Sequence, residues 1–105
     1  MKLLNIDHIP GKEIKALGIV KGTIVHTKNI GRDFMAVMKT LVGGELTGYT
    51  QMLNEARQIA VKRMVDEAEE IGADAIVNVR YGTSSVMSGA AEVIAYGTAV
   101  KVIDK

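Results

Sequence analysis

Asp7, His8 and His26 are the residues whose side chains could together hold a metal ion. Imidazole nitrogens and carboxylate oxygens are ligands that zinc, copper and nickel accept. Asp7 and His8 are adjacent, whereas His26 lies further along the chain, and the histidines do not form an H-x-x-x-H pair. A site would form only if the N-terminal segment folded back along the segment that carries His26. The simpler interpretation is two surface histidines without a metal, and both interpretations remain open from the sequence.

Groups that could support catalysis are present but lack the arrangements that catalysis requires. The sequence holds no cysteine, which excludes a thiol nucleophile, a thiolate metal site and a disulfide. Ser84, Ser85 and Ser88 occur outside any G-x-S-x-G nucleophile elbow. The carboxylate pairs Asp66-Glu67 and Glu69-Glu70 are expected on a solvated helix face. We therefore expect a protein that is not an enzyme.

The pair Gly43-Gly44 raises the possibility of a phosphate-binding loop built from backbone amides. Such a loop has the pattern G-x-x-x-x-G-K-[ST], and the segment GGELTGY at 43–49 contains no lysine. Glu45 would also repel a phosphate at the start of the following helix. The pair is better explained as a joint that ends one helix and lets the next begin, with one glycine in the left-handed conformation.

Length and composition limit the partners and the compartment of the protein. A chain of 105 residues suits one domain, residues 1–105. A net charge of +1 provides no basic field that would hold a nucleic acid. The N-terminal sequence has no apolar signal segment, and no apolar run approaches the ~18 residues of a membrane span. We expect a cytoplasmic protein with neither a nucleic-acid nor a membrane partner.

The hydrophobic periodicity predicts an α+β domain. Alternating apolar residues predict strands at 13–28, 74–81 and 92–103. Apolar residues three and four apart predict a short helix at 32–42 and a long helix from about 49 to 71. The small and polar residues between the last two strands predict a loose hairpin connection at 82–91. This order predicts a small antiparallel or mixed sheet packed on one long helix.

Small residues mark two strands as places of close contact. Gly18 and Gly22 in the first strand predict a bulge or a close backbone approach. One face of the last strand consists of the small apolar residues Val93, Ala95, Gly97 and Ala99. Because one helix covers one face of a sheet, we expect this second face to be buried by another copy of the chain. Closed cyclic symmetry would satisfy every copy equally, which predicts a homo-oligomer.

Several short segments spread over nearly the whole chain carry a family resemblance. They are Gly31-Arg32-Asp33, Leu41-Val42-Gly43-Gly44-Glu45-Leu46, Gly48-Tyr49, Glu55-Ala56-Arg57, Gly72-Ala73-Asp74-Ala75 and Tyr96-Gly97-Thr98-Ala99-Val100. Together they resemble the YbjQ-like family, small bacterial proteins that are labelled heavy-metal-binding and are otherwise uncharacterised. The resemblance implies a β-α-β-β fold similar to the dodecin subunit, assembled as a pentameric ring or as stacked pentamers.

The resemblance implies a function class without naming ligand residues. We expect a non-catalytic, ring-forming binding protein that holds a heavy metal or a small ligand between subunits. The alternatives are a structural or partner-binding module without a ligand, and an uncharacterised enzyme. Asp7, His8 and His26 are the candidate ligands if the cofactor is a divalent metal.

Overall fold

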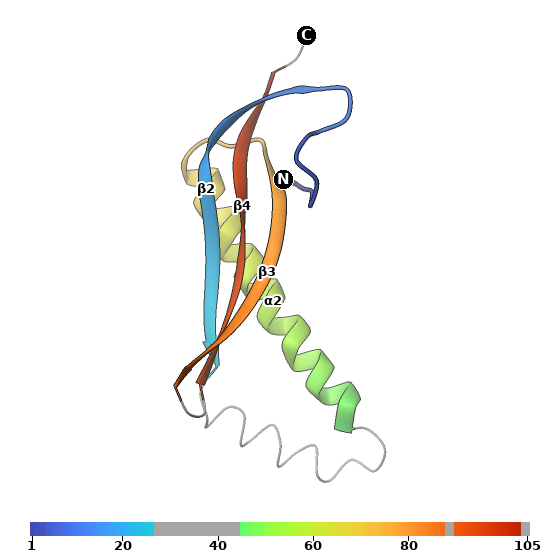
Figure 1. Cartoon of the computed structure of the whole chain (residues 1–105), viewed down its shortest axis with the longest axis vertical. Helices are drawn as coiled ribbons and strands as arrows, with labels where there is room; N and C mark the ends of the chain where they lie inside the picture. Colours follow the sequence, from blue (N-terminus) through green and yellow to red (C-terminus); the bar gives the residue numbers. More distant parts are fainter. Residues whose placement is uncertain (27–44, 88–89, 104–105) are drawn as a thin grey trace.

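A computed structural model describes residues 1–26, 45–87 and 90–103, which form one mixed sheet and one long helix (Figure 1). The elements are β1 (Lys2–Leu3), β2 (Glu13–His26), α2 (Glu45–Glu70), β3 (Ala75–Met87) and β4 (Ala90–Ile103). The strand order is β1-β3-β4-β2. β1 runs parallel to β3, and β4 runs antiparallel to β2 and β3. The α+β class is therefore confirmed. The helix predicted at 32–42 and the Gly43-Gly44 joint lie outside the described residues.

The structure differs from the predicted elements in two places. First, β1 was missed, because a two-residue strand is too short to show a periodicity. The loose connection expected at 82–91 is instead mostly strand, since β3 continues to Met87 and β4 begins at Ala90. In this ribbon, Ser84 pairs with Glu92 and Ser85 pairs with Ala91. Backbone hydrogen bonds hold such a ladder whatever the side chains, so small polar residues did not end the strand.

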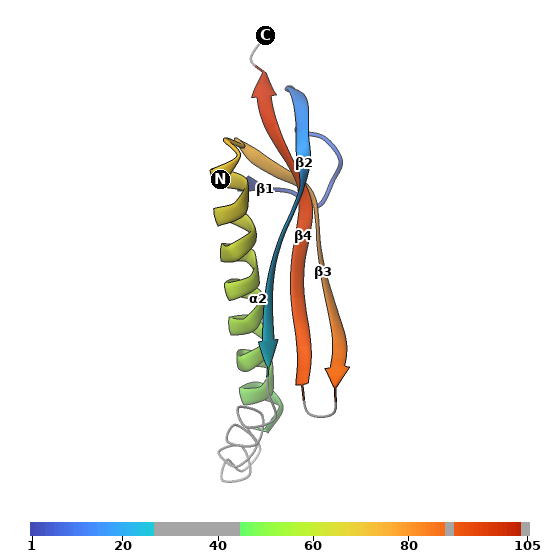
Figure 2. The same ribbon diagram turned by 90° about the vertical axis from the view of Figure 1, so that its left-hand side faces the viewer.

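The main core lies between α2 and one face of the sheet (Figure 2). Ala56, Ala60, Met64 and Ala68 recur every fourth residue along α2, and all four are buried. They pack against Val20 of β2, Ile76 of β3, and Val93, Ala95 and Ala99 of β4. The small-residue face of β4 was expected to receive another copy of the chain. That expectation was wrong, because α2 itself covers this face.

The approach of α2 to β2 is close enough to require a glycine. A Cβ atom placed on Gly22 would collide with the carbonyl oxygen of Ala60 and with the backbone nitrogen of Met64. The side chain of Arg63 crosses the same strand and donates a hydrogen bond to the carbonyl oxygen of Thr23. The prediction of a close backbone contact at Gly22 is confirmed, and the contacting element is the helix.

A bulge in β2 moves its apolar residues from one face of the sheet to the other. The register with β4 shifts between Ala16 and Gly18, and Gly18 has a φ of 146°. The bulge expected near this glycine is therefore confirmed. Even-numbered residues before the bulge therefore face the opposite side of the sheet from even-numbered residues after it. Ile14 therefore packs on the face away from α2, whereas the sequence alternation placed it on the same face as Val20.

The face of the sheet away from α2, here the outer face, is covered by described residues at one end only. The segment 4–12, here the N-terminal lead, crosses that end on the side opposite the helix (Figure 2). Ile9 and Leu4 of the lead pack there with Ala75, Val77 and Val100. Beyond the lead, the outer face carries Ile19, Lys21, Thr23 and Val25 of β2 and Ile94 and Tyr96 of β4. We call these six residues the open outer face.

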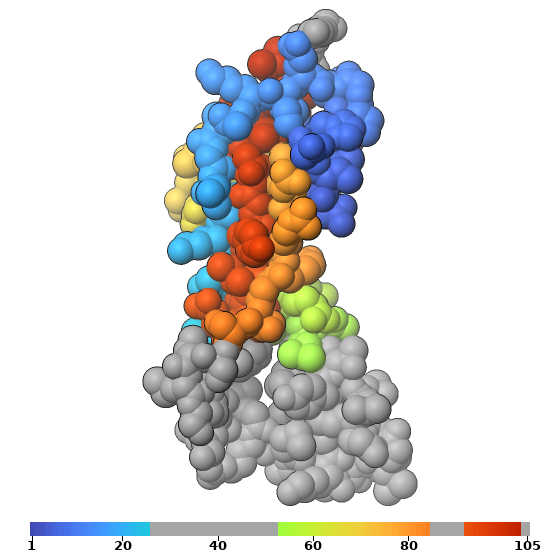
Figure 3. All heavy atoms as spheres, in the orientation of Figure 1, coloured from blue at the N-terminus to red at the C-terminus, as the bar shows by residue number. Residues whose placement is uncertain are grey.

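The open outer face leaves large side chains in water. Ile19 is 80% exposed, Val25 is 47% exposed and Tyr96 is 38% exposed. In the space-filling view, atoms of β4 remain visible between β2 and β3 below the lead (Figure 3). No helix in the described part of the chain is long and apolar enough to cross a membrane.

Candidate functional site

A second bulge, in β3, holds a non-glycine residue in the left-handed backbone conformation. The register with β4 shifts between Val77 and Arg80. Asn78 within the bulge has a φ of 55°, and it is the one non-glycine residue with positive φ among those described. Asparagine tolerates this left-handed conformation better than most residues, yet it remains costly in a strand. Strained residues and bulges of this kind occur often beside functional sites, where they redirect side chains.

The N-terminal lead is fastened to this bulge by two adjacent hydrogen bonds. The backbone nitrogen of Asn78 donates to the carbonyl oxygen of Ile6 at 2.9 Å, and that of Val79 donates to Leu4 at 2.9 Å. Consecutive amides of a regular strand point to opposite edges, so the bulge is what turns both toward the lead. Asn5 lies between the two bonded carbonyl groups, and its backbone is held from both sides.

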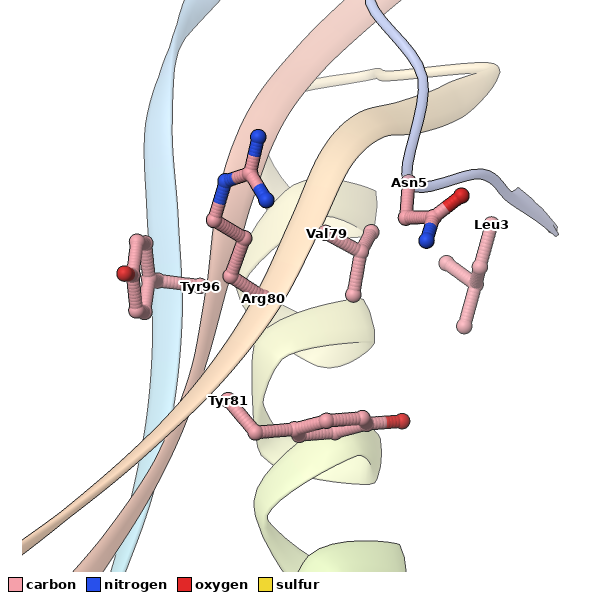
Figure 4. Close-up of a pocket in the computed structure, with 6 residues that line it drawn as sticks. All are labelled: Leu3, Asn5, Val79, Arg80, Tyr81 and Tyr96. Atoms are coloured by element: carbon pink, nitrogen blue, oxygen red, sulfur yellow. The ribbon is translucent and has the colours of Figure 1, made fainter.

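A pocket of about 570 Å³ opens at this point, and we call it the bulge pocket. Figure 4 shows Arg80 and Tyr96 on one side of the β3 ribbon, and Leu3, Asn5 and Val79 on the other. The ring of Tyr81 extends from β3 below Val79 and completes the lining. The volume is in the range of small-molecule sites. The lining offers one guanidinium, two phenols, one amide and two aliphatic side chains.

The lining of the bulge pocket favours binding over acid–base chemistry. Its one ionised group is Arg80, whose guanidinium stays protonated in proteins and cannot act as a general base. Arg80 makes no hydrogen bond or ion pair with any residue in the described ranges. Its five donors are therefore available to an incoming acceptor. The phenols of Tyr81 and Tyr96 and the amide of Asn5 add further hydrogen-bond donors and acceptors to the lining.

Two of the predicted metal ligands are brought together. The Nδ1 of His8 donates a hydrogen bond to Oδ1 of Asp7 at 2.9 Å, and both side chains are exposed. This hydrogen bond, followed by the charge of the imidazolium, lowers the pKa of the Asp7 carboxyl below its usual value. The pair lies in the N-terminal lead, on the outer side of the sheet.

His26 lies far from that pair. It is the last residue of β2 and is in register with Ala91. The lead is hydrogen-bonded to Asn78, and Asn78 lies beside the part of β4 between Tyr96 and Thr98. From there the lead continues toward Val100, in the direction away from His26. At ~3.3 Å per residue, the backbone at His26 is about 20 Å or more from the Asp7–His8 pair. Two ligand atoms on one zinc ion are separated by at most ~4 Å.

The described residues of a single chain do not fit a heavy-metal site. They contain no group of three or more His, Cys, Asp and Glu side chains close enough to share an ion. The Asp7–His8 pair supplies two ligands, whereas a tetrahedral site needs more. Any metal site would therefore need ligands from outside the described part of one chain.

The other groups singled out in the sequence behave as surface residues where they are described. Asp66, Glu67, Glu69 and Glu70 are all exposed on α2, as expected of a solvated helix face. Lys62 forms an ion pair with Asp66 at 3.0 Å, one turn away. Ser84 lies exposed in the middle of the β3 ladder, opposite Glu92. Gly43, Gly44 and Ser88 lie outside the described residues.

The sequence contained two signals for the bulge pocket, but its hydrophobic periodicity did not indicate them. Asn78 interrupts a run of β-branched and apolar residues, and asparagine is the residue type most often found at positive φ after glycine. Two of the three tyrosines of the chain, Tyr81 and Tyr96, line this one pocket. That both line one pocket, from opposite faces of the sheet, could not be predicted without the register of β3 and β4.

Relatives of this chain cover its whole length. A UPF0145 protein from Clostridium novyi (strain NT) is 58% identical over 103 residues, covering 98% of this chain and 100% of the relative. A UPF0145 protein from Thermotoga maritima is 53% identical over 103 residues, covering 97% of each chain. Neither name denotes an enzyme, which is consistent with a non-catalytic role.

The fold is also found in a solved structure. A crystal structure of a DUF74-family protein of unknown function from Pediococcus pentosaceus matches with a TM-score of 0.68, covering 98% of each chain at 16% identity. This likeness supports the α+β architecture alone. A family model described as "Putative heavy-metal-binding" matches residues 1–103. The chain therefore belongs to the YbjQ family, whose close relatives carry the name UPF0145.

Proposed function

We propose that this protein is a non-catalytic binding protein that assembles with copies of itself and holds a small ligand between subunits. The observation that carries the proposal is the bulge pocket, which lies beside the open outer face at an edge of the sheet. The pocket is open, so a second chain seated on the outer face would enclose a ligand there. Enclosure removes water and strengthens polar contacts with the ligand.

The apolar surface left in water supports self-association. Ile19, Val25 and Tyr96 lie on one face with no layer from the described residues above them. A large apolar patch on a small domain is typical of an interaction surface. A second copy of the chain is the simplest cover, since the same surface is then buried on every subunit.

The sheet edges support a ring. In the described residues, β2 pairs only with β4, and β3 beyond Arg80 pairs only with β4. Exposed strand edges can be extended by strands of a neighbouring chain. Because the two edges are different, edge-to-edge pairing would be head-to-tail, and such contacts close into a ring when the rotation permits. Five subunits is the number that the family resemblance implies.

The assembly is tested by light scattering and native mass spectrometry on the wild type and on Ile19→Glu. We expect the wild type at a multiple of the subunit mass and Ile19→Glu as smaller species with unchanged circular dichroism. The matched control is Gln58→Glu, an added charge on the exposed face of α2, which should leave the assembly intact. A wild type that is monomeric at micromolar concentration would overturn the assembly.

A heavy metal between subunits is the second candidate function. It is favoured by the Asp7–His8 pair, which offers two ligands on the exposed lead, and by the description of the family model. A neighbouring copy would have to supply the remaining ligands. Elemental analysis of purified protein, together with calorimetric titration of Zn²⁺ into wild type and His8→Ala, tests it. Equal heats for the two proteins would remove this pair as a metal site.

Native mass spectrometry of the same protein samples also distinguishes two further candidate functions. A structural or partner-binding module would assemble but would carry neither a metal nor a small molecule in native mass spectrometry. An enzyme would convert a bound small molecule, so its native spectra would show the product in place of the cargo. Cargo that remains bound in native spectra without being converted would support the binding protein.

A further inference from the structure

Cations lie near the bulge pocket on both faces of the sheet. On the α2 face, two neighbouring hollows share its Tyr81, one lined also by Arg57 and Lys62 and the other by Arg57. The linings of the three hollows contain Arg80, Arg57 and Lys62, and they contain no carboxylate. Lys62 is neutralised by Asp66, and Arg57 donates to the amide oxygen of Asn54. Arg80 is thus the cation best placed to receive an anion.

The sheet register adds a second cation beside Tyr96. Lys21 of β2 and Arg80 of β3 are both in register with Tyr96, one on either side. Directly opposed residues on one face have Cβ atoms about 5 Å apart, so the two cations flank the phenol ring. The carboxylate on this face of β4, Glu92, is four positions away along the strand, or about 13 Å. An anion would therefore meet a positive local field at Tyr96.

The uncharged part of the lining indicates what accompanies the anionic group. Tyr96 is exposed beside Arg80 on the outer face, so its ring can stack on a flat ligand. Tyr81 is in register with Ala95 and therefore lies on the α2 face. The other lining groups, Leu3, Val79 and the Asn5 amide, lie across the β3 ribbon from Arg80 (Figure 4) and offer apolar surface and hydrogen bonds. Asn5 and Val79 are held by the hydrogen bonds of the bulge, so these contacts are in place before a ligand arrives.

We propose that the bulge pocket binds a small planar ring that carries a phosphate or carboxylate group. The guanidinium of Arg80 holds the anionic group, and the ring of Tyr96, which lies opposite Arg80 on the outer face, holds the planar part. This inference rests on the proposed binding function and names its ligand class. It assigns the anion to Arg80 of β3 rather than to the Gly43-Gly44 pair that the sequence analysis tested for phosphate binding.

The test compares four probes by isothermal titration calorimetry. Adenosine 5′-monophosphate and benzoate carry both a ring and an anion, whereas adenosine carries only a ring and inorganic phosphate only an anion. We expect at least one of the first two to bind at least about tenfold more tightly than adenosine or phosphate, because both halves of the site contribute. Preference between adenosine 5′-monophosphate and benzoate distinguishes a phosphate from a carboxylate ligand.

Three variants assign the binding to this pocket. Arg80→Gln should weaken the preferred probe by at least about tenfold, as expected when a charge-assisted contact is lost, and should leave adenosine unchanged. Tyr96→Leu should weaken adenosine and the preferred probe together. Lys15→Gln removes an exposed cation of β2 outside the pocket and should change neither. Circular dichroism and light scattering on each variant show that fold and assembly are retained.

The outcomes separate this inference from the function on which it rests. An assembled wild type that binds none of the four probes overturns the anion site and leaves the assembly standing. Equal affinity of Arg80→Gln and wild type for the preferred probe also overturns it. A monomeric wild type that nevertheless binds the probe through Arg80 supports the anion site and overturns the proposed assembly.

Discussion

The two faces of the sheet use apolar residues in opposite ways. Under α2, β4 presents alanine, glycine and valine, and Ala95 and Ala99 have no exposed surface. On the outer face, the strands present larger residues, yet Ile19 is 80% exposed. Apolar character alone therefore does not distinguish the covered face from the open one.

Residue size distinguishes the two faces of β4. A helix packed on a sheet needs room for its own backbone, and the β4 residues beneath α2 are small, whereas β3 contributes the larger Ile76. Gly22 is the extreme case, because its Cα lies against the backbone of α2. The small residues of β4 are thus a sign of a helix within the same chain, and the large exposed residues of β2 are the better sign of an external partner.

Ala99→Glu should have the largest effect and tests the covered face directly. Its carboxylate would be buried beneath α2 without a cation, which should cost more than about 3 kcal/mol. We expect loss of the helical circular dichroism signal rather than folded, smaller species. Ile19→Glu, the same charge on the outer face, should stay folded. A folded Ala99→Glu would show that α2 does not cover this strand.

Gly22→Ala should have the next largest effect. The added methyl group meets backbone atoms of α2, which cannot move aside as a side-chain tip can, so we expect a loss of about 2–3 kcal/mol. Urea denaturation at a fixed protein concentration measures it. Gly82→Ala is the matched control, because its methyl group meets only the Cγ2 of Ile94, at 3.1 Å. Equal losses for the two variants would argue against a close helix–strand contact.

Substitution of Asn78 tests the bulge that joins the lead to the sheet. Asn78→Val places a β-branched residue at a φ of 55° and should cost about 1–3 kcal/mol. Asn78→Gly accepts this φ without a steric clash and should be close to neutral. Thermal unfolding of both variants at one concentration measures the difference. If valine and glycine were equally stable here, the left-handed conformation would not be required.

His8→Gln should have the smallest effect, because it changes an exposed pair on the lead. The pKa of Asp7 should rise toward its usual value when the imidazole is removed, and carboxyl NMR titration measures it. A lowered folded-state pKa contributes stability above the unfolded value of about 3.9, and this contribution is lost as the pH falls through the folded pKa. An unchanged Asp7 titration in the variant would show that the pair does not form in solution.

The sequence was sufficient for features that depend on local periodicity. The long helix was predicted because Ala56, Ala60, Met64 and Ala68 recur at its turn spacing, and the structure confirms it. Gly18 and Gly22 identified the bulge and the close contact, since a glycine inside a strand usually has such a reason. The family resemblance was likewise readable from short ordered segments, and the family is confirmed.

The candidate sites were less predictable. Asp7 and His8 are adjacent in the sequence and form a hydrogen bond in the structure, whereas His26 was linked to them by an assumed fold of the lead. The bulge pocket was missed altogether, since its lining comes from β1, the lead, β3 and β4. Nothing in the local spacing of Asn5, Arg80 and Tyr96 indicates that they meet.

The sequence by itself determined the helix, the positions of the main strands and the glycines that interrupt them. Only the tertiary structure decided which strand face lies under α2 and which stays open. The reason is that two bulges, at Ala16–Gly18 and Val77–Arg80, each reverse the alternation of a strand. The alternation of side chains along a strand predicts which residues share a face only within a stretch that contains no bulge. Which side the helix then covers depends on packing between residues distant in the chain.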